Sequence, residues 1–532
     1  MLLLGLLSSV SLAQTKAPAK VRRLSLQDCI KLTLEYNLDL KIDRYNPQIS
    51  LFTYRATYGD YDPSFTLSGE HIHSESGSRI LSGGFSIPGS VSDSDSFSSG
   101  LTGLLPWGTR YGLGTGTPIQ NTYGTSGASV NDLSNPLFFT TNNIVLLTNG
   151  TTQPVSFLRT NFAQTAGRAP FENSVGSVEL RVSQPLLKNF LIDQTRLSIR
   201  VARIGLKESE LVLKTQVMDV ITTLEKAYYD LIYDRENVAV QQKALEAAEQ
   251  LVAENRKKVE VGALAPLDLK SAEAQRESSL GDLITAQSTL AVQENLFKQF
   301  MTSRYTDWAD ISIEPAEALS ANRQALNVQD SWSKGLAQRP ELLQARLDVE
   351  KAGIQVKYSR NQLLPELDVF ATYGYNGSGR EFSDALNDIE RTDRPYYTYG
   401  GSITLPLARI KERNNHSADK ARREQFVWSL KKLEQSIIVT IASDIRQVQS
   451  SYEQVNARRK AREFAEDDLA AEKKKLESGK STPYTVLQKL RDLTTARGGE
   501  IQALANYNKN ISQLSRDEGT TLERLNVNFE TK

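Results

Sequence analysis

Histidine and cysteine, the side chains that most often carry out acid–base, nucleophilic or metal chemistry, are scarce in this sequence. Its 532 residues include three histidines and one cysteine. His71 and His73 alternate along an expected strand and would share one face, but two ligands rarely suffice to hold a metal ion. We therefore interpret both as ordinary polar strand residues and expect no metal site.

The short motifs of common enzyme classes are missing as well. The sequence has no glycine-rich phosphate loop, no Gly-x-Ser-x-Gly turn and no Cys-x-x-Cys pair, and three methionines are too few for a soft-metal cluster. Cys29 cannot form a disulfide within one chain, and its place in a helical pattern indicates a small buried residue. The sequence favours a protein that is not an enzyme and that uses no cofactor.

Charge and apolar segments narrow the class further. Lys plus Arg and Asp plus Glu number 63 each, so no net charge favours nucleic acid as a partner. Residues 1–13 form an apolar run that ends in Ser11-Leu12-Ala13, which is typical of a cleaved signal peptide, although no basic residue precedes Lys16. No later stretch approaches the ~18 apolar residues of a membrane helix. We expect that strands, if anything, span a membrane.

The helices and strands expected to carry any functional residue are duplicated. Residues 26–72 and 328–374 share one pattern of helix, proline and strand, related by a constant shift in numbering. Later parts of the copies also correspond, including the turns Gly262–Pro266 and Gly479–Pro483. Glycine after a helix and proline at the start of the next are the expected stop and start signals. We expect a first structural repeat at 24–327 and a second at 328–532, each with a helical hairpin whose tip lies near 262 or 479.

The helices of these hairpins are unusually long. No proline interrupts residues 190–260, and a second long helix is expected at about 409–477. Apolar residues recur every seventh position in both, which favours coiled-coil packing. The members are Val217, Leu224, Leu231, Val238, Leu245, Val252 and Val259 in the first helix, and Ile441, Val448, Val455, Leu469 and Leu476 in the second, where Arg462 is the exception.

Paired shorter helices match each long helix in length. Helices 26–56 and 266–300, laid end to end, equal the first long helix at 1.5 Å per residue, and helices 328–360 and 483–516 equal the second. Each copy can therefore build two antiparallel helical columns of equal height. Such columns are suited to the wall of a tube.

Four segments alternate apolar and polar residues as strands do. They begin near Phe65, Val175, Leu367 and Tyr397, and each is about ten residues long, as tilted membrane-barrel strands are. A soluble sheet would alternate equally well, but tyrosines stand where a barrel would have its aromatic girdle: Tyr373, Tyr375, Tyr397 and Tyr399. Four strands cannot close a barrel, so we expect the barrel to be shared between chains.

The segment 74–175 between the first two strands is rich in Gly, Ser, Thr and Asn. Within it, residues 97–105 and 109–117 flank Pro106-Trp107-Gly108 and predict a further hairpin. The second copy has only about 377–395 in the equivalent place. We interpret the long version as an elaborated surface loop.

The residues of the repeat resemble those of the TolC outer-membrane efflux protein family. Residues 24–40 are similar to that family's opening helix, and Gln184–Leu187 is similar to its strand-to-helix corner. The resemblance covers nearly the whole chain after the signal peptide. It implies a mainly α protein with a membrane β-barrel: a homotrimer in which each chain gives four strands to a shared 12-stranded barrel in outer-membrane lipid, above a long α-helical coiled-coil barrel in the periplasm. The loop 74–175 would be extracellular.

The resemblance also assigns roles to the turns. Family members use their helical tips to bind a periplasmic adaptor (membrane fusion) protein that links them to an inner-membrane transporter. The matching tip residues here are Val261, Gly262, Ala263, Leu264, Gly479, Lys480 and Ser481. The periplasmic entrance of the family often carries acidic residues beyond the second tip; the matching Thr485 and Gln488 are uncharged, whereas the first copy has Asp268. A ring of three Asp268 carboxylates would attract cations, but helix N-termini also favour Asp for its interaction with the helix dipole.

These observations favour the outer-membrane exit duct of a tripartite efflux or type I secretion system, a passive channel opened at its periplasmic tip by an adaptor and an inner-membrane pump. The alternative is a periplasmic coiled-coil adaptor or scaffold protein without a channel. Two hairpins of equal height and the tyrosines at strand ends speak against it. An enzyme is the third alternative, and it would require a stable monomer with a closed pocket. The exported substrate does not follow from the sequence.

Overall fold

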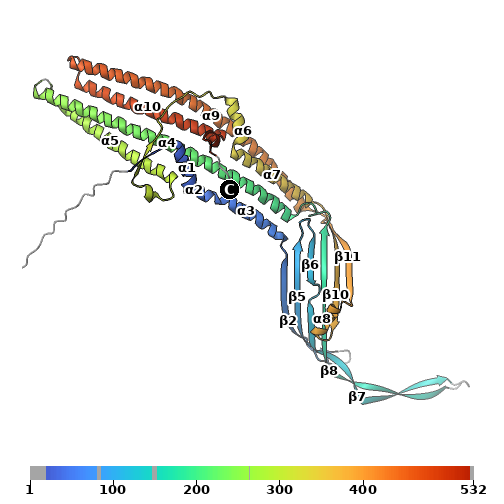
Figure 1. Cartoon of the computed structure of the whole chain (residues 1–532). Helices are drawn as coiled ribbons and strands as arrows, with labels where there is room; N and C mark the ends of the chain where they lie inside the picture. Colours follow the sequence, from blue (N-terminus) through green and yellow to red (C-terminus); the bar gives the residue numbers. More distant parts are fainter. Residues whose placement is uncertain (1–19, 81–85, 147–151, 263, 528–532) are drawn as a thin grey trace, which may run out of the picture. The chain divides into compact units, whose positions relative to one another are not determined.

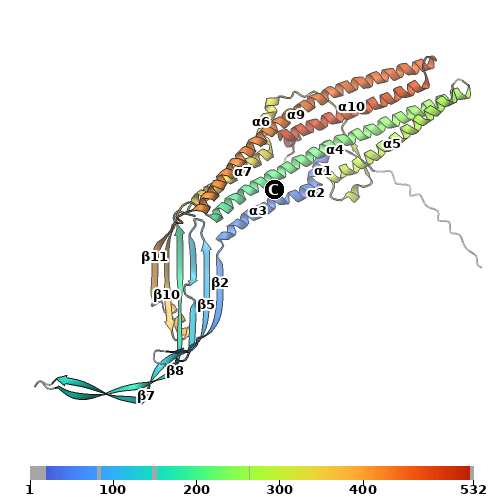
Figure 2. The ribbon, with the colours of Figure 1, turned by 180° about the vertical axis from the view of Figure 1, so that it is seen from behind.

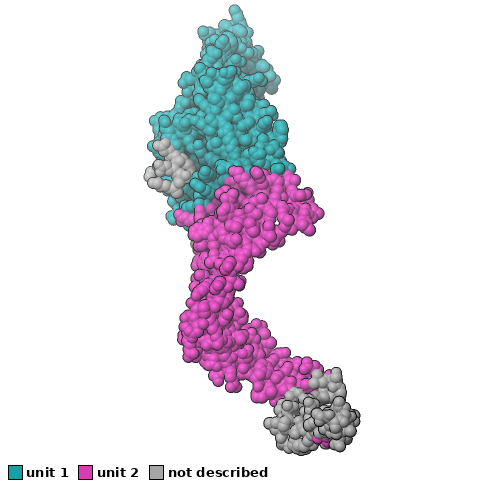
Figure 3. Space-filling model, turned by 90° about the vertical axis from the view of Figure 1, so that its right-hand side faces the viewer, with its two compact units in different colours: residues 1–54, 201–353, 420–532 teal, residues 55–200, 354–419 magenta. Residues whose placement is uncertain are grey.

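A computed structural model of the chain describes residues 20–80, 86–146, 152–262 and 264–527. Contacts within the chain group it into two compact units (Figure 3). Unit 1 comprises Met1–Tyr54, Val201–Gly353 and Lys420–Lys532, and unit 2 comprises Arg55–Arg200 and Ile354–Asp419. Each unit contains segments of both sequence copies. The expected signal peptide, residues 1–13, lies outside the described residues.

Four long helices lie mostly in unit 1 and run side by side in both ribbon views (Figures 1 and 2). They are α4 (Gln194–Glu260), α5 (Pro266–Met301), α9 (Ile410–Glu477) and α10 (Pro483–Glu518). α4 has 67 residues and α9 has 68. At 1.5 Å per residue each is about 100 Å long. The expected ranges of these helices agree with the structure to within a few residues.

The seven-residue repeat faces the helical core. Val217, Leu224 and Leu231 of α4 are fully buried, and Ile441, Val448 and Val455 of α9 are at most 2% exposed. Arg462, the exception in the seven-residue repeat of α9, forms ion pairs with Glu466 (3.1 Å) and Glu500 (2.6 Å). Helix propensity alone does not stabilise such long helices. Packing of the buried apolar heptad residues supplies the stability.

The two shorter columns are divided into more helices than expected. Residues 26–56 form α1 (Leu26–Tyr36), α2 (Leu38–Asp43) and α3 (Tyr45–Ala56). Asn37 leaves the helical conformation, and its side chain accepts a hydrogen bond from the Leu40 amide (3.0 Å). Residues 328–361 form α6 (Val328–Gln338) and α7 (Pro340–Asn361), because Arg339 precedes a proline and adopts an extended ψ of 118°.

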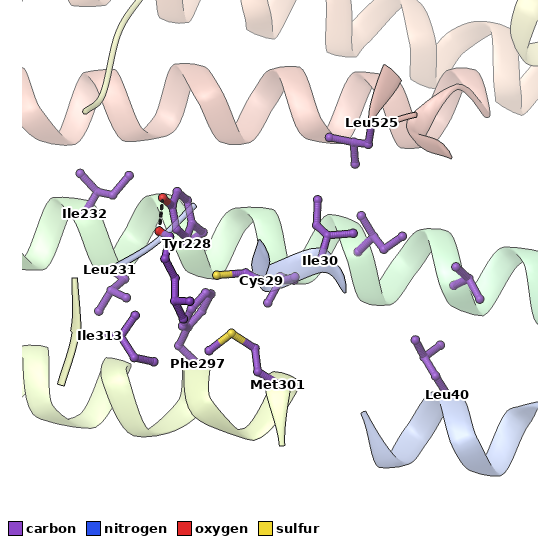
Figure 4. Close-up of a cluster of buried hydrophobic side chains, with 14 of the residues drawn as sticks. Cys29, Ile30, Leu40, Tyr228, Leu231, Ile232, Phe297, Met301, Ile313 and Leu525 are labelled. Atoms are coloured by element: carbon purple, nitrogen blue, oxygen red, sulfur yellow. Dashed lines mark hydrogen bonds between the residues drawn. The ribbon is translucent and has the colours of Figure 1, made fainter. Parts of the chain in front are cut away.

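One apolar core of unit 1 surrounds Tyr228 of α4 (Figure 4). Cys29 of α1 and Phe297 of α5 are fully buried in it, and burial raises the pKa of the Cys29 thiol to about 12. The interpretation of Cys29 as a small buried residue is therefore confirmed. Beside this core, β1 (Lys20–Leu24) pairs in parallel with β9 (Ile311–Pro315).

Unit 2 is built on one antiparallel sheet in the order β11-β10-β8-β6-β5-β2. All four expected strands are present. Its strands are β2 (Ser64–Glu75), β5 (Val91–Leu104), β6 (Arg110–Thr115), β8 (Thr152–Pro185), β10 (Glu366–Gly379) and β11 (Pro395–Thr404), and β7 (Ile119–Leu146) pairs with β5 and β8 beside this path. Unit 2 also contains β3 (Arg79–Ile80), β4 (Ser86–Ile87), α8 (Phe382–Arg391) and η1 (Thr57–Tyr61), whereas η2 (Tyr305–Trp308) and α11 (Thr521–Arg524) belong to unit 1.

The sheet corrects two expectations. Residues 74–175 are not only a surface loop, because β5 and β6 lie inside the sheet between β2 and β8. Within the described residues, the sheet accordingly includes more than the four expected strands. Composition was misleading here: Gly, Ser and Thr are frequent in loops, but they also suit the polar face of a strand whose other face is apolar.

Within the described residues, no helix is both long and apolar enough to cross a membrane. The same residues contain no group of three or more His, Cys, Asp or Glu side chains arranged to hold a metal ion. His71 and His73 lie on β2 and contact Asp95 (2.7 Å) and Asp93 (2.6 Å) on β5. Both histidines therefore make the cross-strand contacts that are expected of polar residues on a strand.

Candidate functional site at the helical turns

The first turn joins α4 to α5 around Gly262. Gly262 has φ +74°, a conformation that costs residues with a Cβ about 1–2 kcal/mol, and its amide donates to the Val259 carbonyl (3.0 Å). Pro266 begins α5, and Ala265 before it provides no side-chain cap. Val261 and Leu267 are 79% and 76% exposed. Leu264 is half-buried, and Ala263 lies outside the described residues.

The second turn, between α9 and α10, has a glycine of almost the same φ and different side-chain contacts. Gly479 has φ +75°, and its amide and that of Lys480 donate to Leu476 (3.1 Å) and Lys475 (2.8 Å). This pattern is a Schellman motif, the usual way to satisfy the last carbonyl groups of a helix. Thr482 caps α10 by accepting a hydrogen bond from the Thr485 amide (3.4 Å).

A side-chain link closes the second turn. The Ser481 hydroxyl donates to the Glu472 carboxylate, which also accepts from Lys475 (3.0 Å). These hydrogen bonds, that of Ser481 first, lower the pKa of Glu472. At the corresponding position of the first turn, seven residues before Gly262, stands Asn255, which is fully buried. Its side-chain amide has no hydrogen-bond partner among the described residues.

The predicted entrance residues occupy the first turns of α5 and α10. Asp268 is half-buried, and its amide donates to the Ala265 carbonyl (3.0 Å). In the part of the chain that the structure describes, Asp268 has no ion pair with a basic side chain. Thr485 is half-buried and belongs to the cap of α10, whereas Gln488 is exposed.

The structure brings the two hairpins together behind their turns. Leu487 of α10 packs against Leu251, Val252 and Ala272 of the first hairpin. Arg491 of α10 donates a hydrogen bond to Gln275 of α5. The two tips are therefore ends of one packed group of four helices.

Ion pairs that sequence reasoning missed join α4 to the end of the chain. Arg516 pairs with Asp219 (2.6 Å), Lys509 with Asp230 (2.7 Å), and Arg524 with Glu225 (2.6 Å). Burial raises the pKa of Glu225, and Arg524 opposes this effect. The partners are separated by 279 to 299 residues. No local pattern in the sequence could have identified them.

The family described as outer membrane efflux protein matches residues 158–300 and 332–518 of this chain. Outer membrane protein TolC of Escherichia coli (strain K12) is 25% identical over 312 residues, which span 57% of this chain and 61% of TolC. The chain thus covers less than two thirds of that relative.

Solved structures extend the similarity to almost the whole fold. The outer membrane protein VceC of Vibrio cholerae is 15% identical with a TM-score of 0.62, over 93% of this chain and 96% of VceC. The CmeC outer membrane channel of Campylobacter jejuni is 15% identical with a TM-score of 0.62, over 95% of this chain and 87% of CmeC. The expected resemblance is confirmed: this chain belongs to the family of outer membrane efflux proteins.

Proposed function

We propose that three copies of this chain form a passive exit duct, with a shared β-barrel in the outer membrane and a helical tunnel in the periplasm. A periplasmic adaptor protein binds the helical tips, and an inner-membrane transporter supplies the energy. The family match and the likeness to outer membrane channels support this duct over the alternative of an adaptor or scaffold without a channel. The family is one of efflux proteins and is not an enzyme family.

The observation that carries the proposal is the exposed apolar face of the sheet. Paired residues of neighbouring strands share a face, and the register aligns Leu180 of β8, Tyr373 of β10 and Tyr397 of β11. These side chains are 46%, 50% and 71% exposed. An apolar surface of this extent is typical of contact with lipid or with another protein.

The edges of the sheet favour closure between copies. Among the described residues, no strand pairs with the outer edge of β2 or with that of β11. Long unpaired edges readily join other chains, and a closed barrel removes them. Pairing β11 of one copy with β2 of the next would satisfy both edges and close the apolar face into a ring.

The duct is tested by purifying the full chain in detergent and reconstituting it in a planar lipid bilayer. We expect a trimer by mass and a conducting pore. A detergent-stable monomer, or a trimer that conducts no current, would refute the duct.

Asp268 permits a sharper test at the entrance. Replacing it with Asn removes three carboxylates from the trimer, so the ring predicts a reduced ratio of cation to anion permeability. Asp492→Asn on α10, an exposed carboxylate outside the first turn, is the matched control. Unchanged selectivity in Asp268→Asn would leave only the interaction of Asp268 with the helix dipole.

Contact with an adaptor is tested with a photo-crosslinking amino acid at Val261 or at Lys480. We expect both positions to crosslink to the periplasmic adaptor that the same cells produce, and the exposed Thr285 on α5 to serve as the control. Equal crosslinking at Thr285 would contradict a contact restricted to the tips.

A further inference from the structure

The hairpin of β5 and β6 lies in the middle of the sheet. β5 pairs with β2 from Ser64↔Thr102 to Glu75↔Val91. On its other side β5 pairs with β6 at residues 100–104 and with β7 at residues 91–97, so β6 and β7 together act as one strand. That combined strand pairs in turn with β8. With β6 and β7 counted as one, the described residues of the sheet thus form six strands side by side.

The hairpin also spans the sheet from one end to the other. Its turn at Leu105–Thr109 is closed by hydrogen bonds from the Leu105 amide to the Thr109 carbonyl (2.8 Å) and from the Gly108 amide to the Leu105 carbonyl (2.8 Å). A Cβ at Gly108 would lie 2.7 Å from the Arg196 guanidinium in the first turn of α4. The turn therefore reaches the end of the sheet at which β8 leads into α4.

The side chains of the hairpin continue both faces of the neighbouring strands. Leu101 of β5 lies between Phe65 of β2 and Leu113 of β6, and Leu113 is paired with Leu180 of β8. Phe65 and Leu113 are 68% and 50% exposed. At this level of the sheet a row of apolar side chains runs from β2 to β11, whereas further along β2 and β5 the same face carries the His71–Asp95 and His73–Asp93 pairs.

On the opposite face, Thr102 is paired with Gly112, and Gly112 with Arg181. The polar residues of the hairpin thus share a face with those of β8. A loop lying in a channel or outside it would be in water on both faces and would gain nothing from this alternation.

We infer that β5 and the combined β6–β7 strand are part of the membrane wall, so that each copy contributes six strands and three copies close a barrel of eighteen. The inference rests on the proposed trimeric duct and replaces the twelve strands implied by the resemblance. Every neighbouring pair from β2 to β11 is antiparallel, so β11 of one copy also runs antiparallel to β2 of the next.

An eighteen-stranded wall changes what the duct can pass through the outer membrane. Barrel diameter grows roughly linearly with strand number, so the diameter is about 1.5 times that of a twelve-stranded barrel and the cross-section roughly twice as large. Barrels of this size enclose an aqueous channel. The membrane section therefore admits bulkier solutes than a twelve-stranded barrel would.

Spin labels on single cysteines test this placement in the full chain, reconstituted in lipid vesicles with Cys29 replaced by Ala. Labels at Leu101→Cys and Leu113→Cys should be accessible to oxygen dissolved in lipid. Labels at Thr102→Cys and Gly112→Cys should be accessible to a water-soluble nickel chelate; a Cβ at Gly112 meets only the Thr102 methyl group, at 3.7 Å. Leu180→Cys and Arg181→Cys on β8 are the matched controls for the two faces.

The outcomes distinguish failure of the inference that the hairpin is part of the membrane wall from failure of the proposed duct. Alternating accessibility in the hairpin and in β8 supports the inference. Alternation in β8 with water accessibility at all four hairpin positions removes the hairpin from the wall and leaves the duct intact. Loss of alternation in β8 overturns both.

A direct strand count on the unlabelled chain gives an independent measurement that needs no substitution. Electron cryomicroscopy of the trimer in lipid nanodiscs should show eighteen strands in the wall. A wall of twelve strands, with the hairpin outside it, would overturn the inference.

Discussion

The two helical turns have a glycine in the same backbone conformation but are stabilised by different side-chain contacts. Gly262 and Gly479 have φ values of +74° and +75°, and a proline begins the next helix in both. The second turn adds a threonine cap and the link between Ser481 and Glu472. The first turn has no side-chain cap. Duplication has thus kept the geometry of the turn while its side-chain contacts have diverged.

This difference indicates which turn opens more readily. Side-chain caps and closing hydrogen bonds each stabilise a helix end by about 1 kcal/mol. Among its described residues, the first turn has neither a side-chain cap nor a side-chain link like that of Ser481, and it exposes Val261 and Leu267. We therefore expect the α4–α5 turn to exchange its amide hydrogens faster than the α9–α10 turn.

Asn255→Leu should stabilise the first hairpin by about 1–3 kcal/mol, because it removes a buried amide without hydrogen-bond partners and keeps a similar volume. The measurement is the midpoint of chemical unfolding, with hydrogen exchange in α4 as a local reading. Glu472→Leu, the same change at the equivalent position of the second hairpin, is the comparison and should destabilise its turn. Destabilisation by Asn255→Leu would show that the amide is satisfied in the assembled protein.

Gly262→Ala and Gly479→Ala should each destabilise their turn by about 1–2 kcal/mol, since both glycines adopt a left-handed conformation with open space around the missing Cβ. The cost is conformational, so the two effects should be equal despite the different caps. Hydrogen exchange of the neighbouring amides measures it. Gly281→Ala within α5 is the control and should be neutral or stabilising. Unequal effects would contradict a shared backbone geometry.

Thr482→Ala should cost the second turn about 1 kcal/mol, because it removes the side-chain cap of α10. The reciprocal change Ala265→Ser should add a cap to α5 and slow exchange at the first turn by a similar factor. Together the two variants should reverse the order of exchange rates. If neither rate changes, capping does not explain the contrast.

The link between Ser481 and Glu472 should make the second turn sensitive to acid. Its hydrogen bonds lower the pKa of Glu472 in the folded chain, so the stabilisation is present above the pKa of the unfolded chain and is lost as pH falls through the folded-state value. Proteolysis at the turn, followed from pH 6 to about 3, should accelerate at the acidic end. Ser481→Ala should weaken this dependence, and an unaltered profile would refute the role of the link.

Much of the fold follows from local patterns in the sequence. The ends of α4, α5, α9 and α10 were predictable because proline and glycine restrict the backbone at single positions. The burial of Val217 and Ile441 followed from a seven-residue period. The division of helix 26–56 at Asn37 was missed, since a side-chain cap within a long apolar pattern gives only a weak signal.

The candidate site was only partly predictable. The sequence located both turns and Asp268, but it did not indicate the bond between Ser481 and Glu472 or the unsatisfied amide of Asn255. These features depend on which helix face is turned toward a neighbour. That choice is made by packing between elements that are distant along the chain.

The duplication, the lengths of the columns, the positions of the turns and the alternation of the strands all follow from the amino-acid sequence. Each depends on backbone preferences and on the spacing of apolar residues over a few turns or pleats. The folded chain was needed to show that β5 and β6 lie between β2 and β8, and that Arg516 and Arg524 pair with Asp219 and Glu225. Which strands pair, and which charges meet, depends on contacts between remote parts of the chain. Local sequence patterns do not specify such contacts.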